Sequence, residues 1–343
     1  MMLYDQFLTT LTTQKNIQHA FSSIVYKWNG SHLESYQFLA EGRINIVFRL
    51  IVIYNHNLEN FILKIYMSDD SEFWQGEGKE FYLEKLLKLN SFSNYPKSYI
   101  YNNKMDDIPY SYEIMEEIRG GILTNMNFNI DFQKLGFVLA QLHKIKVKSY
   151  GKDLLSSQHE SADTYYANYF LNAINCFEKY NGELATTFLK LWDTSYEPDL
   201  YKKITPVLIH HDVHAHNIFI DKFGYPILID WDSARGGIKE YDFIKLKYLN
   251  TNFYTKDQKE NILKGYLSIA NLNFDKNFIL YELCWLARMY IFEMKHPYYG
   301  QYFPNKEFYY ENFINLSTQV EDKSNFYKNY PDKFFEGVIA NEY

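Results

Sequence analysis

The sequence predicts an α+β protein with a small N-terminal antiparallel β lobe and a larger, mainly helical C-terminal lobe. Short segments rich in β-branched residues crowd the first third of the chain, whereas the rest carries long amphipathic patterns. Arg119-Gly120-Gly121 interrupts the pattern between these parts and is the expected linker. We therefore expect two lobes, residues 1–118 and residues 119–343.

The N-terminal lobe is expected to begin with one amphipathic helix and a hairpin within residues 1–35. Strand, turn and strand follow at 36–54, with the turn at 41–45, and a further strand at 61–66. Residues 77–89 have the apolar spacing of a helix, and 99–101 and 111–115 are typical of strands. This order of elements indicates an antiparallel sheet with one helix inserted.

The C-terminal lobe is expected to be helical apart from one hairpin. Helices are predicted at 132–145, over 164–192 as one or two helices, and at 241–249, 258–270 and 278–293. Two short apolar runs, 207–209 and 227–229, are predicted to pair as the hairpin. Each run ends in polar residues, so the hairpin would bring them to one end.

Composition limits the class of protein. The 343 residues are 47% hydrophobic and 22% charged, with a net charge of −7 and a pI of about 5.8. This balance favours a cationic small-molecule partner over nucleic acid. Two cysteines outside any C-x-x-C pattern, the lack of a signal-peptide pattern and the lack of a membrane-spanning run favour a cytoplasmic protein without membrane association.

The most informative residues follow the two apolar runs. His210-His211-Asp212 ends the first, Asn217 follows five residues after Asp212, and Asp230-Trp231-Asp232 ends the second. Phosphoryl transfer from a nucleotide requires such a set, because one carboxylate orients and deprotonates the acceptor hydroxyl while an amide and a second carboxylate hold magnesium. Asp212 is thus the candidate catalytic base, and Asn217 and Asp230 are the candidate Mg²⁺ ligands.

This stretch resembles the aminoglycoside phosphotransferase and choline kinase superfamily. The family loop H-G-D-x-x-x-x-N matches residues 210–217, with His211 at the usual Gly or Arg position, and the family motif I-D-W matches 229–231. The resemblance implies a bilobal protein-kinase-like fold, Mg²⁺, and ATP or GTP as phosphate donor. Asp230 is not followed by the Phe-Gly of protein kinases, which favours a small-molecule kinase over a protein kinase.

Further site residues are expected in the N-terminal lobe. Lys64 lies inside an apolar strand and should meet phosphate oxygens and a carboxylate, because an unpaired buried ammonium is costly. Glu80 is its expected partner, since Glu80-x-x-Leu83-x-x-Leu86 resembles the family helix; Glu77 and Glu84 are alternatives. The resemblance also places the turn Gly42-Arg43-Ile44-Asn45 over the phosphates and assigns the purine to the backbone of Glu116 and Ile118. No Walker A motif is present.

The sequence says less about which residues bind the acceptor. Glu282 and Trp285, on the predicted helix with Tyr281 and Arg288, are candidate contacts for a cation, although aromatic residues at this spacing more often form core with a snorkelling arginine. Asp232 has three open roles: a second metal, the acceptor, or a cap. The resemblance makes His210 and Asp242 structural supports of the loop. The family's acceptors include aminoglycosides, choline and other amino alcohols.

Two other functions compete with a kinase. A binding-only pseudokinase is disfavoured because Lys64, Asp212, Asn217 and Asp230 are all present. A metal-dependent hydrolase would use the alternating His210, His214 and His216 as ligands. That interpretation leaves the Asp-x-x-x-x-Asn and Asp-Trp motifs unexplained.

Overall fold

The computed structural model describes residues 3–14, 17–42, 44–67, 78–125, 130–152, 154, 162–200, 204–249, 254–295, 304–321, 330 and 334–335. Contacts group the chain into two units. The first contains residues 1–122 together with 218–233, and the second contains 123–217 and 234–343. The segment after Asn217 therefore returns to the first unit, a feature that the expected linear division at residue 118 does not include.

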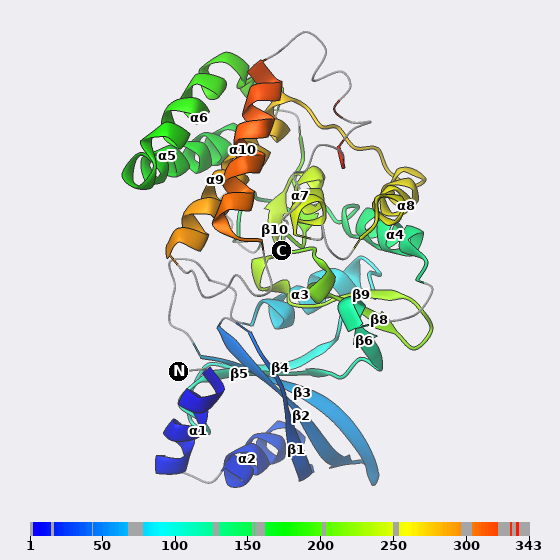
Figure 1. Cartoon of the computed structure of the whole chain (residues 1–343). Coiled ribbons are helices and arrows are strands. Elements are labelled where there is room, and N and C mark those ends of the chain that lie inside the picture. The colour runs from blue at the N-terminus through cyan, green and yellow to red at the C-terminus, as the bar shows by residue number, and fades with distance from the viewer. Residues whose placement is uncertain are drawn as a thin grey trace. The chain divides into compact units, whose positions relative to one another are not determined.

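The first unit is built on a five-stranded antiparallel sheet (Figure 1). Its strands run in the order β1-β2-β3-β5-β4. Their bounds are β1 His32–Glu41, β2 Asn45–Tyr54, β3 Asn57–Tyr66, β4 Ser98–Asn102 and β5 Ser111–Glu116. Helix α3 (Lys79–Leu89) is inserted between β3 and β4, as the sequence predicts. A second sheet, ordered β6-β8-β9, joins Gly120–Ile122, Ile218–Asp221 and Pro226–Leu228.

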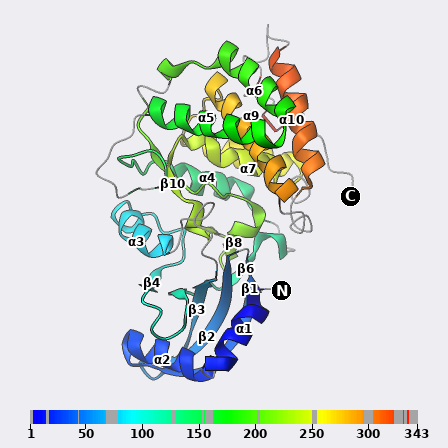
Figure 2. The ribbon, with the colours of Figure 1, turned by 90° about the vertical axis from the view of Figure 1, so that its left-hand side faces the viewer.

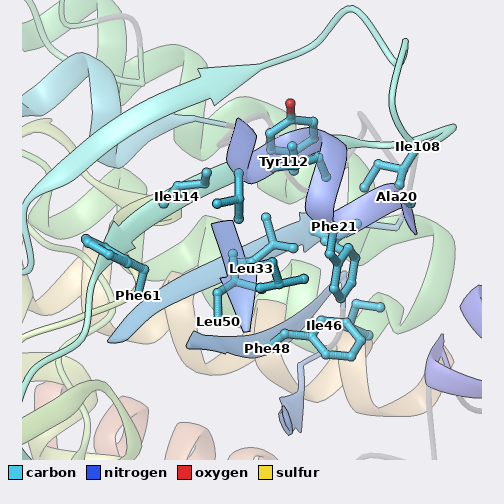
Figure 3. Close-up of a cluster of buried hydrophobic side chains, with 14 of the residues drawn as sticks. Ala20, Phe21, Leu33, Ile46, Phe48, Leu50, Phe61, Ile108, Tyr112 and Ile114 are labelled. Carbon is cyan, nitrogen blue, oxygen red and sulfur yellow. The ribbon is translucent and has the colours of Figure 1, made fainter. Parts of the chain in front are cut away.

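Two helices precede the sheet, where the sequence suggested one helix and a hairpin. Helices α1 (Leu3–Gln14) and α2 (Ile17–Asn29) pack on β1 and β2. Figure 3 shows Phe21 of α2 beside Phe48 of β2, and the ring centroids lie 5.0 Å apart in an edge-on arrangement. Both side chains are fully buried, and each contributes about 1.5–3 kcal/mol through burial. The N-terminal segment thus completes the core on this face of the sheet.

A buried acid lies in this unit at the middle of β5. Glu113 has no exposed surface and accepts hydrogen bonds from the hydroxyls of Ser98 and Tyr66, the latter at 2.9 Å. Burial, aided by the negative charge of Glu80, raises the pKa of Glu113 to about 8. The folded protein therefore holds a proton on Glu113 at pH values where the unfolded chain has released it.

We expect this proton to make stability depend on pH. Between the ordinary carboxyl pKa and about 8 the folded state binds one more proton than the unfolded state, so the free energy of unfolding falls as pH rises. The slope from this group is at most about 1.4 kcal/mol per pH unit. Urea unfolding across this range should show a shallower fall for Glu113→Gln; an identical slope in both proteins would contradict the assignment.

The second unit is mainly helical (Figure 2). Its helices are α4 Phe132–Leu142, α5 Ala162–Tyr180, α6 Gly182–Ser195, α7 Asp242–Tyr248, α8 Lys256–Leu267, α9 Lys276–Lys295 and α10 Lys306–Glu321. Helices α4 and α8 approach closely at two glycines, since a Cβ on Gly136 would lie 2.0 Å from the carbonyl oxygen of Ile262. None of the helices in the described ranges has the length and hydropathy needed to cross a membrane.

The expected hairpin of the C-terminal lobe is wrong. Strand β7 (Val207–Ile209) pairs antiparallel with β10 (Arg235–Gly237), whereas β9 pairs with β8 in the other unit. Both apolar runs form strands, as predicted, but they do not pair with each other. Their polar ends are therefore placed by two separate local structures.

Candidate functional site

In the first unit, Lys64 of β3 is surrounded by three carboxylates. Its ammonium lies 3.0 Å from Glu80, 2.9 Å from Asp230 and 3.0 Å from Asp232, and the residue is only 5% exposed. Burial alone would lower the pKa of Lys64, but Asp230, Asp232 and Glu80 together hold it well above its usual value. Lys64 is therefore a fixed, buried cation in a net negative cluster.

Local structure explains how these side chains meet. Glu80 lies in the first turn of α3, which begins after Gly78 in a left-handed conformation with φ of 65°. The backbone N–H of Trp231 donates to Glu80 Oε1 at 3.2 Å, and the buried Trp231 indole donates to the carbonyl of Leu228. Trp231 thereby anchors the short helix 231–233, and the carboxylates of Asp230 and Asp232 that flank it in sequence both reach Lys64.

Asp232 has a defined partner. The residue is 7% exposed, and one of its oxygens accepts from Lys64. Burial, together with the charges of Glu80 and Asp230, raises its pKa well above the usual value despite Lys64. The sequence predicted the pairing of Lys64 with Glu80 but did not reveal Asp232 or Asp230 as further partners of the lysine.

In the second unit, the loop after β7 is held by Asp242. Its carboxylate accepts from the backbone N–H of His210 at 2.9 Å and of His211 at 2.6 Å, and it contacts His143 Nε2 at 3.0 Å. Asp242 and His143 are both buried. These contacts agree with the supporting role that the sequence assigns to Asp242.

Asp212 follows this braced segment. Its carboxylate contacts Lys245 Nζ and lies 3.4 Å from His214 Nε2, while its backbone carbonyl accepts from the side-chain amide of Asn217 at 3.1 Å. Burial would raise the pKa of Asp212, but Lys245 and His214 outweigh it and hold the pKa well below the usual value. The side chain is therefore ionised and oriented, as a residue that accepts a hydroxyl proton must be.

Lys245 was not predicted from the sequence. It lies three residues after Asp242 in α7, and residues at this spacing share one face of a helix. Because Asp242 was already expected to support the loop that carries Asp212, the spacing is a signal that could have identified Lys245.

The four histidines of the loop do not gather as a metal site. The backbone of His210 bonds Asp242, the ring of His211 contacts the Tyr281 hydroxyl at 2.8 Å, and His214 contacts Asp212. Within the described part of the chain, Glu80, Asp230 and Asp232 form the group of potential metal ligands, with ligand atoms within 4.8 Å of one another. The arrangement does not favour the hydrolase that uses His210, His214 and His216.

The predicted turn and purine-binding segments belong to the first unit. The N–H of Gly42 donates to the carbonyl of Asn45 at 2.8 Å, and a Cβ on Gly42 would meet the Asn45 side chain at 2.7 Å. Arg43 and Glu77 lie outside the described residues. Glu116 and Ile118 border a cavity of about 590 Å³ whose lining does not include Lys64. Their assignment to the purine stays a prediction.

Glu282 and Trp285 face inward on α9. Glu282 has no exposed surface, accepts from Lys247 at 2.7 Å and Tyr248 at 2.6 Å, and contacts the Tyr330 hydroxyl. Trp285 is 6% exposed and stacks on Tyr248. Their enclosure does not favour a role as acceptor contacts. The sequence could not show this, because it does not reveal that Lys247 neutralises Glu282.

We expect Glu282→Gln to lower stability and leave acceptor kinetics unchanged. The substitution keeps the side-chain shape but leaves the buried Lys247 ammonium without its counter-charge, at a cost of about 3–5 kcal/mol. Chemical denaturation measures the loss, and the KM for the acceptor tests the site. A raised KM with unchanged stability would instead restore Glu282 to the acceptor site.

Comparison with known proteins identifies the family. The sequence profile of the phosphotransferase enzyme family matches residues 35–276, well over half of the chain. A comparison with curated proteins gave no significant match.

Solved structures share the fold. The gentamicin complex of APH(2")-IIa has a TM-score of 0.58 at 18% identity, covering 89% of this chain and 97% of that one. Spectinomycin phosphotransferase APH(9)-Ia, in complex with ADP and spectinomycin, has 0.55 at 16%, covering 92% and 93%. Choline kinase LicA from Streptococcus pneumoniae has 0.58 at 15%, covering 87% and 97%. With this fold and the matched profile, the chain belongs to the phosphotransferase enzyme family.

Proposed function

We propose that the protein transfers the γ-phosphate of ATP or GTP to a hydroxyl group of a small molecule in a Mg²⁺-dependent reaction. The observation that carries this proposal is the state of Asp212, which is ionised by Lys245 and His214 and fixed on a braced loop. Such a carboxylate can orient the acceptor hydroxyl in line with the γ-phosphorus and accept its proton as the bond to phosphorus forms. Family membership supplies the reaction class.

The residues present suit a magnesium ion. Glu80 Oε2 and Asp232 Oδ1 are buried oxygens without hydrogen-bond partners in the described part of the chain, and the half-exposed Asp230 lies beside them. Magnesium prefers such oxygen donors, and within this unit we assign it to Asp230, beside Glu80 and Asp232. The assignment of Asn217 as a further ligand stays a prediction from the sequence. When bound, the ion would neutralise charge on the nucleotide phosphates, while Lys64 would pair with phosphate oxygens.

Amines are the first class of acceptor molecule to test. The similar structures name gentamicin, spectinomycin and choline kinase, so an aminoglycoside or an amino alcohol is one form of the proposal. The acidic composition of the chain suits the same class. Glu282 is buried and so is not accessible as a carboxylate contact for the amine of such a substrate.

A nucleotide-consumption screen tests the proposed reaction. ATP and GTP are each offered with Mg²⁺ and a panel of aminoglycosides, amino alcohols, sugars and hydroxy acids, with Asp212→Ala in parallel. Acceptor-dependent turnover that disappears in the variant supports phosphoryl transfer. Acceptor-dependent turnover that survives in Asp212→Ala would contradict the assigned base, and stoichiometric zinc or iron in the purified protein would favour a metalloenzyme.

A further inference from the structure

The residue that precedes Asp212 has an unusual backbone conformation. His211 adopts φ of 62°, in the left-handed region that residues other than glycine rarely occupy. Its ring does not turn back to the loop but contacts the hydroxyl of Tyr281 on α9 at 2.8 Å. Backbone strain held by a specific side-chain contact next to a catalytic group points to a function for that contact.

Tyr281 begins a line of stacked side chains across two helices. Its ring stacks on Tyr169 of α5, with centroids 5.1 Å apart, and Tyr169 in turn lies under the guanidinium of Arg288 at 5.0 Å. Figure 2 shows α5 and α9 together in the helical unit. Tyr281 is buried, Tyr169 is half-buried and Arg288 is exposed, so the line runs from the interior to the surface.

Arg288 has the position of a ligand-binding group. It lies seven residues after Tyr281 on α9, about 10 Å along the helix axis. Within the described residues no carboxylate forms an ion pair with it, and the Tyr169 ring fixes its orientation. A guanidinium held on an aromatic face presents its N–H donors to a carboxylate or a phosphate.

The charges around His211 favour the same ligand. Burial and then the positive charges of Arg235, Lys245 and Arg288 hold the pKa of His211 well below its usual value, against the opposing charge of Asp212. Burial is the first of these causes, and the three cations add to it. The same cations would attract an anionic group of an acceptor that lies near this ring.

We propose that the acceptor is a hydroxyl compound with an anionic group, which Arg288 binds while His211, Tyr281 and Tyr169 form the wall between that group and Asp212. This inference rests on the proposed phosphoryl transfer and replaces its cationic acceptor by an anionic one. The carboxylate or phosphate of the acceptor pairs with the guanidinium, and a hydroxyl further along the molecule reaches Asp212.

Equilibrium binding to the whole 343-residue chain tests this proposal without turnover. The probes form matched sets of anion, neutral compound and cation: gluconate, glucose and glucosamine, and glycerol phosphate, glycerol and choline, with gentamicin as a polycation. We expect an anionic member to bind most tightly, and Arg288→Gln to weaken its binding by about tenfold or more, as the loss of a charge-assisted contact would. Arg288→Lys should retain only part of that affinity, because lysine keeps the positive charge but lacks the planar set of N–H donors that the Tyr169 ring orients.

Lys295→Gln is the matched control. Lys295 lies on the same helix and also contacts a tyrosine ring, at 4.3 Å from Tyr180, but it is two further turns away from Tyr281. Its variant should bind the anion as the wild type does.

The proposal is overturned if no anionic probe binds at millimolar concentration, if a cationic probe binds best, or if Arg288→Gln and Lys295→Gln bind the anion equally well. Failure of the proposed phosphoryl transfer would be a different result. It would appear in the turnover screen as acceptor-dependent turnover that does not require Asp212.

Discussion

The Asp212→Asn variant is expected to lose phosphoryl transfer by about 10²- to 10⁴-fold in kcat while it retains affinity for the magnesium nucleotide. Asparagine keeps the size of the side chain and can still accept from Lys245, but it cannot accept the acceptor's proton. Lys64, Glu80, Asp230 and Asp232, which we assign to the phosphates and the metal, are unchanged by this substitution.

The measurement is kcat with the best acceptor, together with the Kd of the nucleotide in the presence of Mg²⁺. Asp193→Ala serves as a control, because Asp193 is an exposed carboxylate on α6 of the same unit. Retention of a substantial fraction of kcat in Asp212→Asn would remove Asp212 from the role of base. Loss of nucleotide binding would show that the loop, rather than proton transfer alone, had been damaged.

Lys245 makes this result informative about the timing of proton transfer. An ammonium in contact with Asp212 lowers the basicity of the carboxylate, so Asp212 is a poor base before the acceptor has begun to bond to phosphorus. In a loose transition state the hydroxyl becomes acidic only late, and a weak but well-oriented base is then sufficient. Orientation would thus contribute more than basicity to the effect of Asp212.

The sequence predicted the parts of the molecule whose determinants are local. The α+β class is confirmed, and helix α3 and the strands of the first sheet lie where their periodicity placed them. The pairing of β7 with β10 was not predictable in the same way, because Arg235-Gly236-Gly237 has no strand signal and pairs only through tertiary contacts. Helix α10 also escaped prediction, as did the two-helix form of the N-terminal segment.

The site residues also fall into those with a local sequence signal and those whose role depends on a distant partner. A strand lysine, a helix glutamate and an Asp-Trp motif have strong local signals, and the structure brings Lys64, Glu80 and Asp230 together. Asp232, Lys245 and Glu282 were misjudged or missed because their roles depend on which charge lies opposite across the fold. A single sequence gives the type of a charged residue but not its partner.

The Lys64→Met variant is expected to lose both stability and nucleotide binding. Removal of the ammonium leaves Glu80 and Asp232 buried beside Asp230 without a counter-charge, which costs about 3–5 kcal/mol near neutral pH. The loss should be smaller at mildly acidic pH, because a proton can then replace the lysine charge on Asp232, whose pKa is already raised. Urea unfolding at both pH values, with exposed Lys85→Met as control, measures this difference.

A double variant separates the two roles of Lys64. If the lost stability comes from repulsion among the carboxylates, Lys64→Met combined with Asp232→Asn should be more stable than Lys64→Met alone, since one of the buried charges is gone. Nucleotide affinity should not recover in the double variant, because the phosphates would still lack the ammonium. Recovery of affinity together with stability would show that Lys64 acts only by neutralising its neighbours, whereas recovery of neither would place the damage in the packing around the Lys64 side chain.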